Sequence, residues 1–445
     1  MPGVARLSGS AVGRFVALLL TACVLTGGSV QAALPGVVEF SAQPESLADA
    51  ELDAVLGKRV AAADVIAIGE SVHGSAGLLR VQTRLIRYLV SRHGLRLIAW
   101  ENPPLRSLEL ARWLASCSKT LTPLPLDVLY MPTAADRGLW EWLCEHNRAN
   151  SADPVLLRGV DVWDRPWMHY EQIDRLQGRI DAPAALHGRV RSSCPGYGAR
   201  SWDELDRRLP APRQGPRFLP ENRFEDCRAA LTGVMETARA AGQAARSAGD
   251  AVAAADAYEL ALSASTLLGW LGFYHLEQAD DVLSWNERDR AQGRNLMLVM
   301  EMQDARRALL AAHTSHVSHN RSPADWWGFG DLKSGVFFFR ELAGKRVFNI
   351  ALTAYRASGT QGDWLEPVAA NSMDRRLHEA GHRFSFFTAD APFLGEHSRW
   401  WMQNGNAAGI ENGVEIVPRD HFDSYFFLGQ SLLEDALPAR PMWRP

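Results

Sequence analysis

Short apolar runs, each ending in ionisable or polar residues, recur along this sequence and limit the folds open to it. Six such runs lie at 64–70, 95–101, 154–161, 307–313, 346–352 and 383–390. Near-continuous apolar runs of this length are typical of strands that helices bury on both faces. We therefore predict an α/β fold with a central, largely parallel sheet flanked by helices.

The segments between the first runs carry helical signals. Residues 78–94 have apolar side chains at helical spacing and end in a glycine, and residues 139–149 show the same spacing before the third run. Parallel strands need crossover connections of this kind. We therefore expect both segments to be helices that connect neighbouring strands.

The middle of the chain has a different composition. Residues 181–220 are rich in proline, glycine and arginine and are predicted to be irregular. The alanine-rich stretch 225–275 has the apolar spacing of two antiparallel helices. We therefore expect a helical insertion or lid at 165–280, which divides an α/β catalytic domain made of 33–164 and 281–445.

The N-terminal segment resembles a targeting sequence. Basic residues precede an apolar stretch at 15–27, which is shorter than the roughly 20 residues of a membrane-spanning helix. Small residues then favour cleavage before Ala33, so residues 1–32 are predicted to be a signal peptide. We expect a periplasmic or secreted protein without a transmembrane span after processing. A lipoprotein anchored through Cys23 is the alternative.

Charge and cysteine content narrow the functional classes. The net charge is −4 and the basic residues are scattered, which argues against nucleic-acid binding. The remaining cysteines permit two disulfides in an oxidising compartment, and the shortest loops pair Cys117 with Cys144 and Cys194 with Cys227. The other two connectivities stay open. A cysteine metal site is not expected, because no two of these cysteines have C-x-x-C spacing.

Ionisable residues end four of the apolar runs. These residues are Glu70, Glu101, Asp161 and His313. Ligands of open α/β sheets bind beyond the carboxyl ends of the strands, so the four side chains are expected to converge there. His73 follows Glu70 in a glycine-bounded loop, where the carboxylate can orient the imidazole and raise its basicity. The partners at the other strand ends favour this interpretation over a simple helix cap.

Alternatives remain for the other polar residues. Glu101 could be part of a structural salt bridge, and Asp161 could cap the next segment. His313 and His316 lie one helical turn apart, where they can polarise a substrate carbonyl or share a metal with the carboxylates. His319 is expected to be a solvent-exposed helix residue.

Several motifs in a fixed order resemble the erythromycin esterase family. They are GESVHG at 69–74, LIAWE at 97–101, WLCEHN at 142–147 followed by LLRGVD at 156–161, WNERDRAQGRN at 285–295, HTSHVSHN at 313–320 and DHFDSYFFL at 420–428. The resemblance covers essentially the whole mature chain. Each motif is weak alone, but their order and spacing make the resemblance specific.

The resemblance implies hydrolysis of a small-molecule ester without a metal or other cofactor. His73 would be the general base that removes a proton from water, with Glu70, Glu101 and His316 around it. His316, or else His313, would donate to the tetrahedral oxyanion. A macrolide lactone and an unrelated ester are both open as substrates.

Arg288 and Asp161 are expected to contact substrate or to support the site. Arg288 could neutralise a glutamate or bind the oxyanion, or it could only pair with Asp289. A basic residue is common in the family near Gln82, and Arg84 on the next turn is its candidate replacement.

Two other functions remain open from the residues. A metal-dependent hydrolase would use Glu70, His73, Glu101 and His316 as ligands. An exported binding protein for haem or another small ligand would use the same histidines without catalysis.

Overall fold

An eight-stranded sheet forms the centre of the fold in the computed structural model, which describes residues 34–117, 124–129, 132–179, 184–208, 219–276, 280–324, 332–358, 364–365, 372–395, 400–402 and 414–431. The strand order is β1-β9-β12-β6-β2-β5-β3-β4. The strands are β1 (Val37–Glu39), β2 (Val65–Glu70), β3 (Leu97–Trp100), β4 (Leu156–Gly159), β5 (Ala308–His313), β6 (Val347–Ala354), β9 (Phe384–Thr388) and β12 (Ser424–Leu428).

The sheet is largely parallel, which confirms the predicted α/β fold. The six strands from β12 to β4 run parallel to one another, and β1 and β9 form an antiparallel edge. All six apolar runs are strands. Two small ribbons accompany the sheet: β7 (Ala357–Ser358) with β8 (Trp364–Leu365), and β10 (Trp400–Met402) with β11 (Val414–Ile416).

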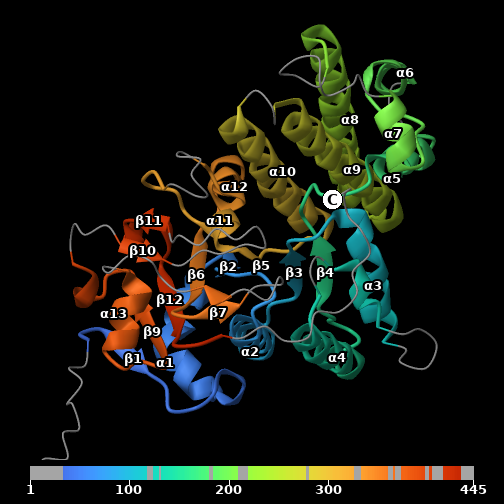
Figure 1. Ribbon diagram of the computed structural model, residues 1–445. Coiled ribbons are helices and arrows are strands. Elements are labelled where there is room, and N and C mark those ends of the chain that lie inside the picture. The colour runs from blue at the N-terminus through green and yellow to red at the C-terminus, as the bar shows by residue number, and fades with distance from the viewer. Residues whose placement is uncertain are drawn as a thin grey trace, which may run out of the picture. The chain divides into compact units, whose positions relative to one another are not determined.

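Helices cover both faces of the sheet because alternate strand residues point to opposite sides. Ile66, Ile68 and Ile98 share one core with α1 (Asp49–Ala62), α2 (Ala76–His93), α3 (Pro104–Ser116) and α4 (Ala134–Ala149). Val65, Ala67 and Leu97 face the other core, which contains α9 (Ala251–Leu276), α10 (Asp281–Met302) and α12 (Gly335–Ala343). Figure 1 shows α9 and α10 on one side of the sheet and α2 and α4 on the other.

The predicted crossover helices are present. The segment 78–94 is α2, which ends where Gly94 takes the left-handed conformation with φ 61°, and the segment 139–149 lies in α4. The shorter helices are α11 (Thr314–Val317), α13 (Met373–Glu379), α14 (Pro418–His421), η1 (Pro44–Ser46), η2 (Leu126–Val128) and η4 (Pro392–Leu394).

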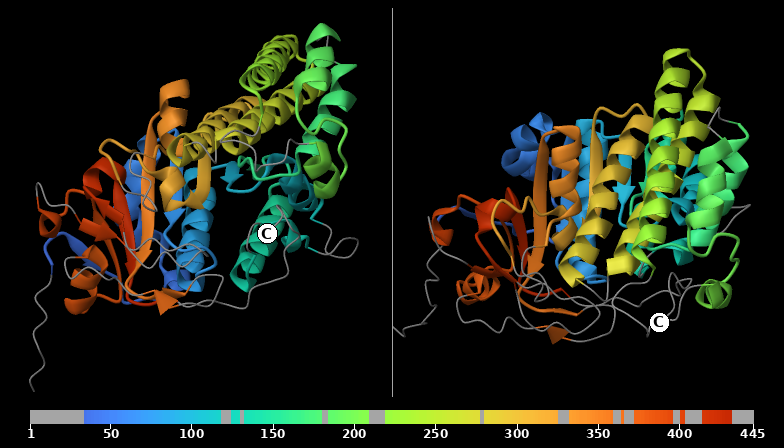
Figure 2. Two further views of the ribbon diagram at one scale, coloured as in Figure 1. Left: turned by 45° about the horizontal axis from the view of Figure 1, so that its top comes forward. Right: turned by 90° about the horizontal axis from the view of Figure 1, so that it is seen from above.

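The middle of the chain is helical, as 225–275 predicts. The helices are α5 (Pro166–Gln177), α6 (Ala184–Ser193), α7 (Trp202–Arg208), α8 (Glu221–Ser247) and α9. The long helices α8 and α9 run side by side (Figure 2). The prediction that 181–220 is irregular is wrong for α6 and α7. Proline and glycine interrupt the segment between these helices, and a disulfide joins Cys194, next to α6, to Cys227 of α8.

One predicted disulfide is formed and the other is not. Cys194 and Cys227 are bonded, but Cys117 and Cys144 form no disulfide with each other. The Cys117 thiol donates instead to the carbonyl oxygen of Cys144 at 2.8 Å. The predicted signal peptide, including Cys23, lies outside the described part of the chain. Within the described ranges, no helix combines the length and apolar character needed to cross a bilayer.

Candidate active site at the carboxyl ends of the strands

The sheet brings the four strand-end residues together. Glu70 and His313 are the last residues of β2 and β5 and are paired in register. Glu101 directly follows β3, where its N–H donates to the Ala311 carbonyl at 2.9 Å. Asp161 follows β4. Strand β2 lies between β5 and β6, where the strand order reverses direction, which is where ligands bind in sheets of this kind.

A histidine–carboxylate pair occupies the loop after β2. His73 Nδ1 donates to Glu70 Oε1 at 2.8 Å, and both side chains are largely buried. The hydrogen bond holds the imidazole in the tautomer that has its basic lone pair on Nε2. The ring of His313 lies close by, 4.8 Å from that of His73 between centroids.

His313 is held on both sides of its ring. Its Nδ1 accepts from the Ser315 hydroxyl at 2.9 Å, and its Nε2 donates to the Ser71 carbonyl at 3.2 Å. Its backbone N–H donates to Glu101 Oε2 at 2.7 Å, so Glu101 is tied to β5. Burial and the charge of His73 lower the pKa of His313 well below its usual value, so this ring is neutral.

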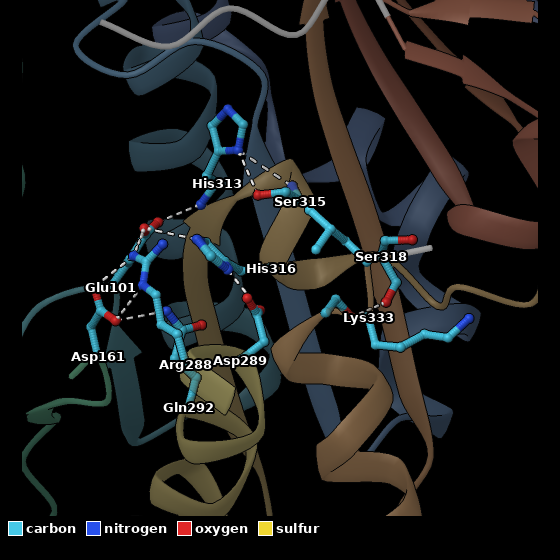
Figure 3. A network of polar contacts seen from close by, with 12 residues as sticks. Glu101, Asp161, Arg288, Asp289, Gln292, His313, Ser315, His316, Ser318 and Lys333 are labelled. Atoms are coloured by element: carbon cyan, nitrogen blue, oxygen red, sulfur yellow. Dashed lines mark hydrogen bonds and ion pairs between the residues drawn. The ribbon is translucent and has the colours of Figure 1, made fainter. Parts of the chain in front are cut away.

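His316 lies between two carboxylates, as Figure 3 shows. Its Nδ1 is 2.7 Å from Asp289 Oδ1 and its Nε2 is 3.2 Å from Glu101 Oε1. Burial lowers the pKa of His316, but Asp289 and Glu101 outweigh this and raise it to about 9. His316 is therefore an imidazolium with both N–H groups engaged, and direct donation to a substrate would require one of these contacts to break.

Arg288 extends this network to β4. Its Nε and one Nη donate to the two oxygens of Asp161 at 3.0 and 2.8 Å, and the same Nη donates to Glu101 at 3.1 Å. Gln292, one turn later on α10, donates to Asp161 at 3.0 Å. Arg288 is thus bound to Asp161 and Glu101, while Asp289 is the partner of His316. Asp161 belongs to this network and also accepts from the N–H of Val162 at 2.7 Å.

The buried charges set the protonation of the catalytic candidates. Burial alone would lower the pKa of His73, but the hydrogen bond to Glu70 and the charge of Glu101 raise it overall. Burial raises the pKa of Glu70. Burial would do the same for Glu101, but the His316 cation holds the pKa of that carboxyl well below its usual range. Glu101 is therefore a permanent negative charge near His73.

A small cavity of about 30 Å³ lies beside this pair, with Glu70, His73, Glu101, Trp100 and Gln82 in its lining. A space of this size holds a water molecule or two. Gln82 therefore faces the site. Arg84 does not replace a basic residue there, because its guanidinium binds Asp49 and the Leu47 carbonyl.

An aromatic cluster borders the Arg288 side of the network. The guanidinium carbon of Arg288 lies 5.2 Å from the ring of Trp163 and 5.3 Å from that of Trp285. Phe273 packs edge-on against both indoles. Since Trp163 and Trp285 are only partly buried, they offer apolar surface next to the charged network.

The sequence model for erythromycin esterase matches residues 90–431, most of the chain. The chain belongs to the erythromycin esterase family. This membership indicates a hydrolase of the esterase type. The match begins after Glu70 and His73, and the sheet places these two residues beside Glu101 and His313, which lie inside it.

Solved structures share the erythromycin esterase fold. A protein from Bacillus cereus aligns with a TM-score of 0.67 at 16% identity over 91% of this chain and 97% of its own. A succinoglycan biosynthesis protein aligns with a TM-score of 0.66 at 15% identity over 91% of this chain and 96% of its own. A mutant of the erythromycin esterase EreC, in its open conformation, aligns with a TM-score of 0.62 at 16% identity over 88% of this chain and 97% of its own. Identities this low show a common fold.

The sequence indicates most residues of this polar network but not the roles of two of them. The sequence predicts Asp289 only as a partner for Arg288 and does not single out Gln292. Gln292 lies four residues after Arg288 on α10, and this spacing, which places the two side chains on one face of the helix, is the signal in the sequence. The prediction for His319 is wrong. His319 lies beyond the end of α11 and is not in a helix; its side chain is 1% exposed and its Nε2 contacts Asp423 at 2.9 Å.

The residues named as metal ligands lie close together but are bound to one another. Glu70 contacts His73, and Glu101 contacts both His316 and Arg288. In the described ranges, no three His, Cys, Asp or Glu side chains are arranged as a metal-binding group.

Proposed function

We propose that this chain hydrolyses a carboxylic ester with a water molecule that His73 activates. The observation that carries the proposal is the His73–Glu70 pair, 2.8 Å apart at a strand end and beside a cavity of water size. Glu70 holds Nδ1–H, so Nε2 is the atom that can accept a proton from water. The negative charges of Glu70 and Glu101 then stabilise the imidazolium that forms.

The reaction follows from this arrangement. His73 takes one proton from water as the oxygen attacks the ester carbonyl, which gives a tetrahedral oxyanion. When the C–O bond of the ester breaks, the His73 imidazolium returns the proton to the leaving alkoxide. Of the two candidate oxyanion donors, His313 fits better, because its Nε2–H donates to a neutral carbonyl, that of Ser71, whereas both His316 donors bind carboxylates.

The neighbouring surface supports an ester with a large apolar part. Trp163 and Trp285 present partly exposed indoles beside the network, and apolar ligands gain affinity by burying such surface. EreC is an erythromycin esterase, so a macrolide lactone is one candidate substrate. We propose an apolar ester and keep macrolides as one member of that class.

Hydrolysis of p-nitrophenyl butyrate and of erythromycin by the purified chain tests this proposal. His73→Ala should lower kcat by about a hundredfold or more, the range for loss of a general base. His187→Ala is the matched control, because that histidine lies on α6, outside the site, and contacts Asp174. Circular dichroism should show both variants folded.

Two outcomes would overturn the proposal. One is near-wild-type hydrolysis by the folded His73→Ala variant. The other is loss of activity after dialysis against a chelator with recovery on addition of a divalent metal, which would support a metal-dependent hydrolase.

A further inference from the structure

A second and larger cavity borders the free edge of the sheet. Strand β4 is the last strand of the sheet, and a cavity of about 610 Å³ lies between it and α3, α5 and α9, with the end of α4 at its rim. These elements lie beside one another in Figure 1. The β4 residues that line the cavity end at Arg158, before the strand end that leads to Asp161. The volume is within the usual range of small-molecule sites, roughly 300–1,000 Å³.

The cavity is rich in positive charge. Four arginines line it, from four different elements: Arg112, Arg148, Arg158 and Arg175. Glu259 of α9 is the acidic residue among its lining side chains. The lining therefore carries more positive than negative charges, and the interior of the cavity attracts an anion.

Arg158 is the most buried of these four arginines. Its side chain is only 21% exposed and its Nη2 lies 3.7 Å from Glu259 Oε1, which is an ion pair beyond hydrogen-bond length. One other Nη donates at 3.3 Å to the carbonyl of Leu157, and the buried Nε has no hydrogen-bond partner in the described chain. A buried donor without a partner costs stability, and an oxyanion in the cavity would supply the missing acceptor.

The rest of the lining is partly apolar. The apolar side chains that line it include Leu108, Ala111 and Ala115 of α3 and Leu156 of β4. A small inorganic anion would leave this surface in contact with water, whereas an aliphatic or aromatic body would bury it. The apolar lining and the positive charge together favour a ligand that has an anionic group and an apolar body.

We propose that this cavity binds an amphiphilic organic anion, in which a carboxylate or phosphate group contacts Arg158 and an apolar body packs against α3. The site is separate from the His73 site and its occupation does not depend on ester hydrolysis. Because Arg158 is three residues before Asp161, the ligand would bind on the strand that also supports Arg288.

Isothermal titration of the purified full chain with decanoate tests the proposal, with decyl phosphate as a second anion. Both should bind, and decyltrimethylammonium, which has the same chain and the opposite charge, should not. Arg158→Gln should weaken decanoate binding about tenfold or more, as expected for a lost charge-assisted contact. Arg59→Gln on the surface of α1 is the matched control and should bind as the wild type does.

A second variant addresses the apolar part. Ala111→Trp should fill the cavity without changing its charge and should also abolish decanoate binding, with thermal melts confirming that both cavity variants fold. His73→Ala should leave decanoate binding unchanged, which separates this site from the hydrolytic one. Equal binding of decyltrimethylammonium, no binding of decanoate to the wild type, or unchanged binding by folded Arg158→Gln and Ala111→Trp would each overturn the proposal.

Discussion

At the scale of single residues, the site is built from pairs whose charges set each other's pKa. Glu70 and Glu101 stabilise the charged form of His73, and His316 and Arg288 in turn neutralise Glu101. The two carboxylates therefore make His73 a better base. The positive charges of His316 and Arg288 offset the free-energy cost of burying the Glu101 carboxylate.

The pH dependence of hydrolysis should report the His73–Glu70 pair. Only neutral His73 can accept a proton, and its pKa is raised, so kcat/KM should rise with pH along a limb centred above the ordinary histidine value of 6.5. Glu70→Gln keeps a hydrogen-bond acceptor but removes the charge. It should move this limb to lower pH and reduce the plateau on the order of tenfold.

A pH–rate profile of kcat/KM from pH 5 to 9 makes this comparison. Glu225→Gln, an exposed change on α8, is the control and should retain the wild-type limb. A limb that stays in place in Glu70→Gln would show that Glu70 does not set the basicity of His73.

His316 should make stability depend on pH in the alkaline range. Its pKa is raised from 6.5 to about 9 in the folded chain, so its stabilisation is complete below pH 6.5 and is lost as pH rises through 9. The loss should be on the order of 3 kcal/mol. Urea unfolding at pH 6.5 and 9.5 measures it. His316→Gln should lose less stability between these values, and an equal loss in both proteins would argue against a buried imidazolium.

At the scale of elements, close approach of α11 to β2 positions the histidines. Gly69 precedes Glu70 in β2, and a Cβ there would lie 2.4 Å from Val317 Cγ2 and 2.8 Å from the Cα of Thr314. Since Val317 and Thr314 belong to α11, only glycine lets that helix pack directly on the strand. The sequence pattern predicts both elements, but this contact depends on the tertiary structure.

Gly69→Ala should therefore disturb the site as well as the core. We expect a loss of about 1–3 kcal/mol in unfolding free energy, typical of overpacking. Hydrolysis should fall on the order of a hundredfold, because small displacements of catalytic groups are costly. Gly178→Ala is the control, since nothing lies within 4 Å of its Cβ position. Urea melts and kcat measurements below the transition compare the two, and equal activity would show that α11 tolerates the shift.

At the scale of the whole molecule, we propose that the mature protein is exported. The apolar stretch 15–27 is short for a membrane span, and the Cys194–Cys227 disulfide is typical of an oxidising compartment. Mass spectrometry of the chain expressed in a bacterial host should find Ala33 at the N-terminus in the soluble periplasmic fraction. Cys23→Ala should be processed in the same way. An acylated Cys23 in the membrane fraction would support the lipoprotein alternative instead.

The features of this protein that the sequence determines by itself are those that depend on local and periodic patterns of residues. Apolar runs predicted six strands, the Gly94 stop predicted the end of α2, and polar residues at the run ends predicted the site, because these features depend on near neighbours and on burial. Only the tertiary structure decides which residues distant in the sequence pair with each other. Asp289 contacts His316, Arg288 contacts Asp161 and Glu101, Cys117 and Cys144 form no disulfide with each other, and His319 is buried. These contacts depend on how α10 and α11 pack against the sheet. Contacts between side chains of different elements produce no periodic pattern in the sequence, so the sequence alone does not predict them.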